Sequence, residues 1–237
     1  MSLGEIFSDA IKYPFSNLTN FAIVGVIALL SGFVGIVNVP NVSGIFSAIL
    51  WIIGLIFTLV LSGYCIDVIK YGIENSSEFP DLDLKRNIIN GIKTVIIGIV
   101  YFIIPFIIVL ILAIVTGAIG VGINNLLVAL GVTAIIAIIV FIIFAIFEMI
   151  ALARFAESDD LGAALSVGEV VEDVKRIGIA KIIGFLIISF VILIITILIF
   201  SLLNFIPVVG IFIGVFISGT FATLFCYRSL GLLYADA

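Results

Sequence analysis

Uninterrupted apolar runs longer than 18 residues recur along the whole chain. This is the length that an α-helix needs to cross the hydrocarbon core of a bilayer. A mean hydropathy of +1.51 also leaves too little polar surface to cover a soluble globule. Transmembrane barrel strands alternate in polarity, and these Ile-, Leu-, Val- and Phe-rich blocks do not. The sequence therefore predicts an all-α, polytopic membrane helical bundle.

The apolar runs predict six transmembrane helices that form three hairpins. Several runs hold about 27 residues, or about 40 Å as a helix, which exceeds a hydrocarbon core of about 30 Å. We expect these helices to tilt or to project at one end. The predicted spans are Leu18–Val37, Gly44–Tyr71, Ile92–Thr116, Leu126–Phe155, Ile177–Leu203 and Pro207–Tyr234.

The links between the spans are of two kinds. Asn38–Ser43, Gly117–Asn125 and Asn204–Pro207 are short and uncharged, whereas Gly72–Gly91 and Ala156–Arg176 are long and polar. All ten Lys and Arg residues fall on the side of the long links and the two termini. Because basic residues near span ends remain in the cytoplasm, the distribution predicts a multi-pass protein of the cell membrane with cytoplasmic N- and C-termini.

The long link after the second span contains a predicted amphipathic helix. Asp81 and Asp83 follow Pro80 as in a first helical turn, where acidic side chains suit the positive end of the helix dipole. Apolar residues then recur every four positions up to Ile92. We expect this helix to lie in the membrane interface and to lead into the third span.

Two further segments have the same amphipathic design. In Asp160–Arg176 the apolar positions share one face, and Asp173 and the neighbouring charged residues are predicted to point away from it. The N-terminal segment, from Leu3 to Ile11, is similar. Each transmembrane hairpin is thus preceded by a predicted cytoplasmic amphipathic interfacial helix.

This arrangement suggests a threefold internal repeat within one integral membrane domain, residues 1–237, with hairpin units at approximately 1–75, 76–156 and 157–237. The sequence at Asp9–Lys12 resembles that at Asn90–Lys93 and at Gly178–Lys181. Hairpins of like orientation would be parallel repeats about the membrane normal.

Three charged residues within the spans are candidates for a polar cluster. Asp67, Glu148 and Arg228 lie 81 and 80 residues apart, each in the second helix of its hairpin. Intramembrane charges often mark a pathway, so the three side chains could form a polar site for a cation or a lipid headgroup. The structural alternative is that they pair locally, Asp67 with Lys70, or extend to the interface.

Two lysines and one proline complete the candidate residues. Lys93 and Lys181 stand at the cytoplasmic starts of their spans, where they could pair with Glu148 or anchor to anionic headgroups. Pro105 interrupts the third span and is a candidate hinge. Tyr101, one turn earlier, could satisfy the backbone polarity that the proline frees.

The chemistry that the sequence lacks narrows the function. The chain contains no histidine, and its two cysteines, Cys65 and Cys226, lie far apart within apolar runs, as expected of packing residues. No phosphate-binding loop or nucleophile motif is present. We therefore expect no catalytic residue, cofactor or metal site, and no enzyme. The absence of a basic stripe argues against nucleic acid.

Some segments resemble a known family. "DAIKYPFSN", "GYCIDVIKYGIE" and "FPDLDLKRNIINGIK" leading into "TVIIGIVYFIIP" resemble an uncharacterised family of archaeal six-span integral membrane proteins, a domain of unknown function. The chain is more remotely similar to the membrane domain of some glycerophosphodiester phosphodiesterases. The resemblance implies a six-span fold and no established activity, and the chain has no soluble catalytic domain of the phosphodiesterase kind.

Two functional hypotheses follow. The first is a non-enzymatic membrane protein that acts through lipid or protein contacts, as a scaffold, accessory subunit or envelope factor. Its partners would be membrane lipids, with another protein or a second copy of the chain as further candidates. The second is a small-solute or ion transporter or channel whose polar site lies near Asp67, Glu148 and Arg228.

Overall fold

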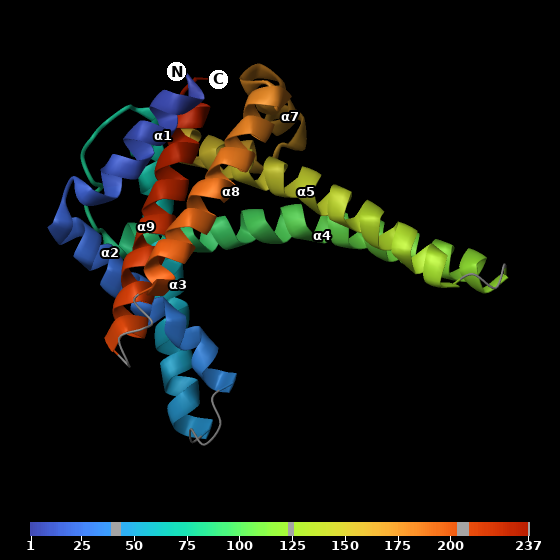
Figure 1. Cartoon of the computed structure of the whole chain (residues 1–237), viewed down its shortest axis with the longest axis horizontal. Helices are drawn as coiled ribbons and strands as arrows, with labels where there is room; N and C mark the ends of the chain where they lie inside the picture. Colours follow the sequence, from blue (N-terminus) through green and yellow to red (C-terminus); the bar gives the residue numbers. More distant parts are fainter. Residues whose placement is uncertain (39–43, 123–125, 203–208, 237) are drawn as a thin grey trace. The chain divides into compact units, whose positions relative to one another are not determined.

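The computed structural model describes residues 1–38, 44–122, 126–202 and 209–236. The three predicted uncharged links lie wholly or partly outside these residues. The described part of the chain is helical and contains no strand (Figure 1). Within it, six helices are long and apolar enough to cross a membrane. The all-α, six-span prediction is confirmed in these terms.

The helices follow the predicted order, and most span boundaries agree to within a few residues. The first and third spans are the exceptions. The α-helix of the first span ends at Ser31 and continues as a 3₁₀ helix that contains two glycines. The helix of the third span runs from Leu84 to Gly122 and so extends beyond the predicted Ile92–Thr116 at both ends. The elements are α1 (Leu3–Lys12), η1 (Tyr13–Phe15), α2 (Leu18–Ser31), η2 (Gly32–Asn38), α3 (Gly44–Ile73), α4 (Leu84–Gly122), α5 (Leu126–Ser158), α6 (Leu161–Leu165), α7 (Val167–Ile177), α8 (Ile179–Ser201) and α9 (Val209–Tyr234).

The chain divides into two compact units. Unit 1 comprises Met1–Thr94 and Asp173–Ala237, and unit 2 comprises Val95–Glu172. The divisions fall within α4 and α7, so each of these helices contributes residues to both units.

In unit 1, α3 packs against α2 and α9, and α1 lies against α8 and α9. Figure 1 shows both chain ends beside each other, next to α1. The start of α4 crosses α3 at very close range, because a Cβ atom at Gly63 would collide with the carbonyl oxygen of Asn87, and one at Gly91 with that of Leu59. Only glycine allows the two backbones to approach so closely. This crossing places Asp67 beside the first turn of α4.

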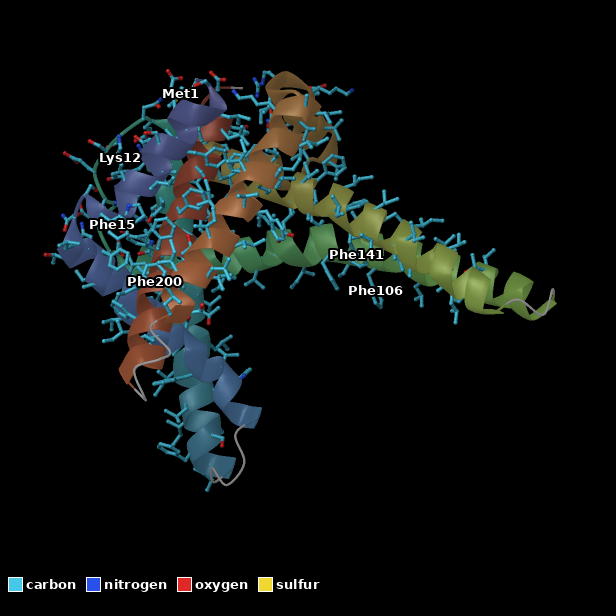
Figure 2. The ribbon with its side chains drawn as sticks, viewed as in Figure 1. Met1, Lys12, Phe15, Phe106, Phe141 and Phe200 are labelled. Atoms are coloured by element: carbon cyan, nitrogen blue, oxygen red, sulfur yellow. The ribbon has the colours of Figure 1, made fainter. Side chains whose placement is uncertain are left out.

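The helix α1 is well defined by its own sequence. Ser2 and Glu5 form a capping box, in which each side chain accepts a hydrogen bond from the other residue's backbone N–H. Ile6, Phe7 and Ala10 are buried on one side, and the Phe7 ring stacks on Phe185 and Phe225. The opposite side is left to polar residues. Figure 2 shows Met1 and Lys12 near the two ends of this helix.

Two local predictions are wrong. The helix α4 begins at Leu84, so Asp81 and Asp83 precede its first turn. Asp83 instead caps the helix, because its carboxylate accepts from the backbone N–H of Arg86 at 3.1 Å. Asp173 is only 2% exposed although the helical pattern placed it on the polar face. A buried carboxylate is stable only with partners, and these are described below.

Unit 2 contains the hairpin of α4 and α5, which run side by side in Figure 1. Phe102 on α4 contacts Phe141 on α5, with ring centroids 5.7 Å apart. Many of its Ile, Val and Phe side chains are exposed, as suits surfaces covered by lipid. Pro105 lies inside α4. Tyr101 was predicted to satisfy the backbone polarity that Pro105 frees. Instead, the Tyr101 hydroxyl donates to the carbonyl oxygen of Ala164 at 3.0 Å.

Candidate functional site

Arg228 is the most deeply buried charged side chain described in unit 1, with 1% exposure. Its Nε donates to the Asp9 carboxylate at 2.8 Å, and its Nη1 donates to the carbonyl oxygens of Tyr71 and Ser76. The guanidinium group also lies 4.7 Å from the centre of the Tyr13 ring. Arg228 therefore fastens α9 to α1, to the end of α3 and to the link that follows α3. Its position relative to the membrane interface stays a prediction.

The residues around Arg228 reinforce this junction. The Tyr13 hydroxyl donates to the carbonyl oxygen of Glu78 at 3.2 Å, and its ring stacks on Phe79 with centroids 4.5 Å apart. Burial raises the pKa of Tyr13 well above its ordinary value, so the hydroxyl remains a neutral donor. The N-terminal segment and the link that follows α3 therefore both contact Arg228 and also contact each other.

A groove of about 430 Å³ opens beside this junction along one side of α1. Its lining combines both charge signs with hydroxyl groups, and includes Glu5, Ser8, Asp9, Lys12, Ser77 and Arg228. The capping hydrogen bonds from Ser2 lower the pKa of Glu5, so this carboxylate is ionised at neutral pH. The groove can therefore bind a charged, polar ligand group.

Asp67 forms a second buried contact, where α4 crosses α3. Its carboxylate accepts from Asn87 Nδ2 at 2.7 Å and from Arg86 Nη2 at 3.0 Å. Arg86 also donates to the carbonyl oxygen of Asp81. Asn87 is fully buried, and its own Oδ1 receives no hydrogen bond from the described residues. Asp67 thus holds the start of α4 against α3.

Asp173 forms the third buried contact of unit 1. Its carboxylate accepts from the Tyr234 hydroxyl at 2.8 Å and pairs with Arg176 one turn along α7. The contact joins the end of α9 to α7. Near it, Asp236 binds Lys181 and the amino group of Met1, and these contacts lower the pKa of Asp236 to about 2.

In unit 2, Glu148 is half-buried on α5 and faces α4, with Oε1 3.2 Å from the position of a Cβ atom at Gly98. Within the described part of the chain, its carboxylate has no hydrogen-bond or ion-pair partner. Arg154, further along α5, pairs with Glu169 on α7. Glycine at position 98 leaves the space that the carboxylate occupies.

The five predicted site residues therefore have different environments. Asp67 and Arg228 lie in unit 1 with separate partners, and Arg228 takes its carboxylate from Asp9. Lys181 binds Asp236 and the carbonyl oxygen of Met1. Lys93 lies in the part of α4 that belongs to unit 1, and Glu148 lies in unit 2. A single cluster of these residues stays a prediction, and so does the hinge at Pro105.

Sequence reasoning missed Asp9 and Asp173 as buried-contact residues, although a pattern links them. Gly4 to Asp9 reads "GEIFSD" and Gly168 to Asp173 reads "GEVVED", so both aspartates occupy the sixth position of a similar segment. Each lies on an amphipathic helix and binds α9. No group of three His, Cys, Asp or Glu side chains within the described residues could hold a metal ion.

Comparison with known proteins gives a family. No curated protein and no solved structure is similar enough to be matched. A family model described as "Protein of unknown function (DUF4013)" matches residues 46–205, from the start of α3 to the end of α8 and beyond it. This match covers more than half of the chain, including Asp67 and Glu148. The chain therefore belongs to the DUF4013 family.

Proposed function

We propose that this protein is a non-enzymatic membrane protein that acts through contacts with lipids or with another protein. The observation that carries the proposal is the use made of the buried charges in unit 1. Asp67, Asp173 and Arg228 each join a transmembrane helix to a segment at one end of the unit. These charges build a fixed polar surface, whereas a transport pathway needs polar groups that are available to a solute.

The charge distribution supports a contact function on one side of the membrane. Of the 25 charged side chains, 15 acidic and 10 basic, all but Glu148 lie in or near the two long links, the termini and the adjoining span ends. We place this charged end in the cytoplasm, on the basis of the lysine and arginine positions. It presents a mixed polar surface beside the headgroup layer, where a scaffold or accessory subunit would bind lipid, a partner protein or a second copy of itself.

A recurring contact supports the proposed threefold repeat. Arg228 in the third hairpin binds Asp9 at the start of the first, and Asp67 in the first binds Arg86 at the start of the second. Arg154 in the second binds Glu169, which precedes the third span pair. Each hairpin's second helix is thus bonded to the segment that opens the next hairpin. We further propose a remote relationship to the membrane domain of some glycerophosphodiester phosphodiesterases, which a role at a lipid surface would suit.

One observation favours the second candidate, a small-solute or ion transporter. Glu148 is a half-buried intramembrane carboxylate whose side chain has no protein partner within the described residues. An ionisable side chain inside the membrane has a high free-energy cost, and such residues are often functional. If transport occurs, Glu148 is the residue that binds the cation or proton.

Reconstituted vesicles distinguish the two candidates. Proteoliposomes holding a pH-sensitive or a K⁺-sensitive dye are compared with protein-free vesicles under an imposed potential. The contact proposal predicts equal leak rates for wild type, Glu148→Gln and empty vesicles. A saturable flux in wild type that Glu148→Gln abolishes would overturn the proposal and establish transport.

A further inference from the structure

We propose that unit 1 binds one membrane phospholipid, with its phosphate in the groove beside Arg228 and an acyl chain along α2. This inference rests on the proposed contact function and names the ligand. Two cavities carry it: the polar groove on α1, and an apolar groove of about 610 Å³ on α2. Ser16 lines the polar groove, and Leu18, two residues further on, lines the apolar groove, so the two grooves follow each other along the chain.

The polar groove offers two positive charges to a bound phosphate. Arg228 donates from Nε to the Asp9 carboxylate and from Nη1 to two backbone carbonyl oxygens. Arg228 lines the groove, but its side chain is only 1% exposed, so it acts on a bound phosphate mainly through its positive charge. The ammonium group of Lys12 has no partner in the described part of the chain, and it lines the same groove. A guanidinium and an ammonium group are the side chains best suited to phosphate.

The acidic residues in the groove do not remove this preference. Glu5 accepts the capping hydrogen bond from the Ser2 N–H at 2.7 Å, and Asp9 is paired with Arg228. Both carboxylates are therefore engaged in the protein. Hydroxyl groups of Ser8 and Ser77 in the same lining can donate to further phosphate oxygens.

The second groove is almost wholly apolar. Leu18, Ala22, Ile23 and Val26 line it, and the first of these is 69% exposed. A hydrocarbon chain fits this surface, and a soluble phosphate ester would leave it uncovered. The combination of a phosphate-binding groove and a neighbouring apolar groove therefore indicates a molecule with a phosphate headgroup and a hydrocarbon tail.

Native mass spectrometry in a non-ionic detergent tests this proposal. The probes are dioctanoyl phosphatidylglycerol, glycerol 3-phosphate as the headgroup alone, and dioctanoylglycerol as the tail alone. We expect one phosphatidylglycerol per chain and at least tenfold weaker binding of either part. If glycerol 3-phosphate binds as tightly as the phospholipid, the groove takes a soluble phosphate and the lipid assignment is wrong.

Two exposed variants address the two grooves without disturbing Arg228. Lys12→Gln removes one cation near the headgroup and should weaken phosphatidylglycerol binding about fivefold. Ala22→Phe fills the apolar groove and should weaken phospholipid binding, with glycerol 3-phosphate binding unchanged. Lys85→Gln, an exposed lysine outside both grooves, is the matched control and should bind like wild type. If Lys12→Gln and Ala22→Phe both retain wild-type affinity, the phospholipid proposal is overturned. The proposed contact function is tested separately, by the flux experiment above.

Discussion

Replacement of Arg228 tests whether the buried charges hold unit 1 together. In Arg228→Met, the carbonyl oxygens of Tyr71 and Ser76 lose charged donors, at about 1–1.5 kcal/mol each for half-buried groups. The Asp9 carboxylate can be hydrated again, because its side chain is 40% exposed, so loss of the ion pair with Arg228 adds less than about 1 kcal/mol. The lost contact with the Tyr13 ring adds about 0.5 kcal/mol. We expect unit 1 to lose about 2.5–4.5 kcal/mol.

The thiol of Cys65 reports this loss. Cys65 lies on α3 and is 2% exposed, so it reacts with a maleimide only when unit 1 opens. In a Cys226→Ser background in mild detergent, a loss of about 2.5–4.5 kcal/mol should raise its labelling rate about 60- to 1,600-fold, since each 1.4 kcal/mol is tenfold.

Two variants complete the experiment. Arg228→Lys keeps the charge but cannot reproduce the forked donor geometry, and should lose about 1–2 kcal/mol. Lys85→Gln removes an exposed lysine and should stay within about 0.5 kcal/mol of wild type. If the labelling rate in Arg228→Met stays within threefold of wild type, the buried network does not stabilise unit 1 and our reasoning is refuted.

Three further predictions follow. Gly91→Ala should lower the yield of folded protein, because the added Cβ collides with the α3 backbone. Gly131→Ala is the control: position 131 has open space around it, so this change should be neutral or slightly stabilising. The yield of folded protein is read from size-exclusion profiles of the two variants. The Asp236 contact with Lys181 lowers the carboxyl pKa from 3.8 to about 2. The stabilisation from this contact is therefore complete above about pH 4 and is lost as the pH falls towards 2. The carboxyl ¹³C shift of Asp236 should titrate near 2, and a midpoint near 3.8 contradicts the contact. Ser77→Cys in a cysteine-free background should resist an impermeant maleimide in intact cells and react after lysis, and labelling in intact cells would reverse the proposed orientation.

Hydrophobic run length predicted the architecture well, because the bilayer imposes one length and one kind of element on each span. The helices α3, α5, α8 and α9 begin or end close to the predicted positions. The interfacial segments were harder to predict, since a helical pattern describes which face is apolar and not which polar groups acquire partners. Asp173 shows this limit: Tyr234, 61 residues away, makes its burial stable.

The candidate site was predictable only as a set of residue types. Asp67 and Arg228 were recognisable as charges inside spans, but equal spacing along the chain does not determine their partners. Asp9 and Asn87 provide those partners, and both lie on segments whose positions depend on long-range packing. The close crossing at Gly63 could likewise not be predicted from the sequence, because nothing distinguishes this glycine among the 22 in the chain.

The most direct test of the contact function is native mass spectrometry of the protein released from its own membranes without added ligand. We predict that the 25.4 kDa chain carries one retained phospholipid, or a stoichiometric protein partner bound at the charged end. A bare chain, released without lipid or partner under conditions that preserve its fold, would contradict the proposed function.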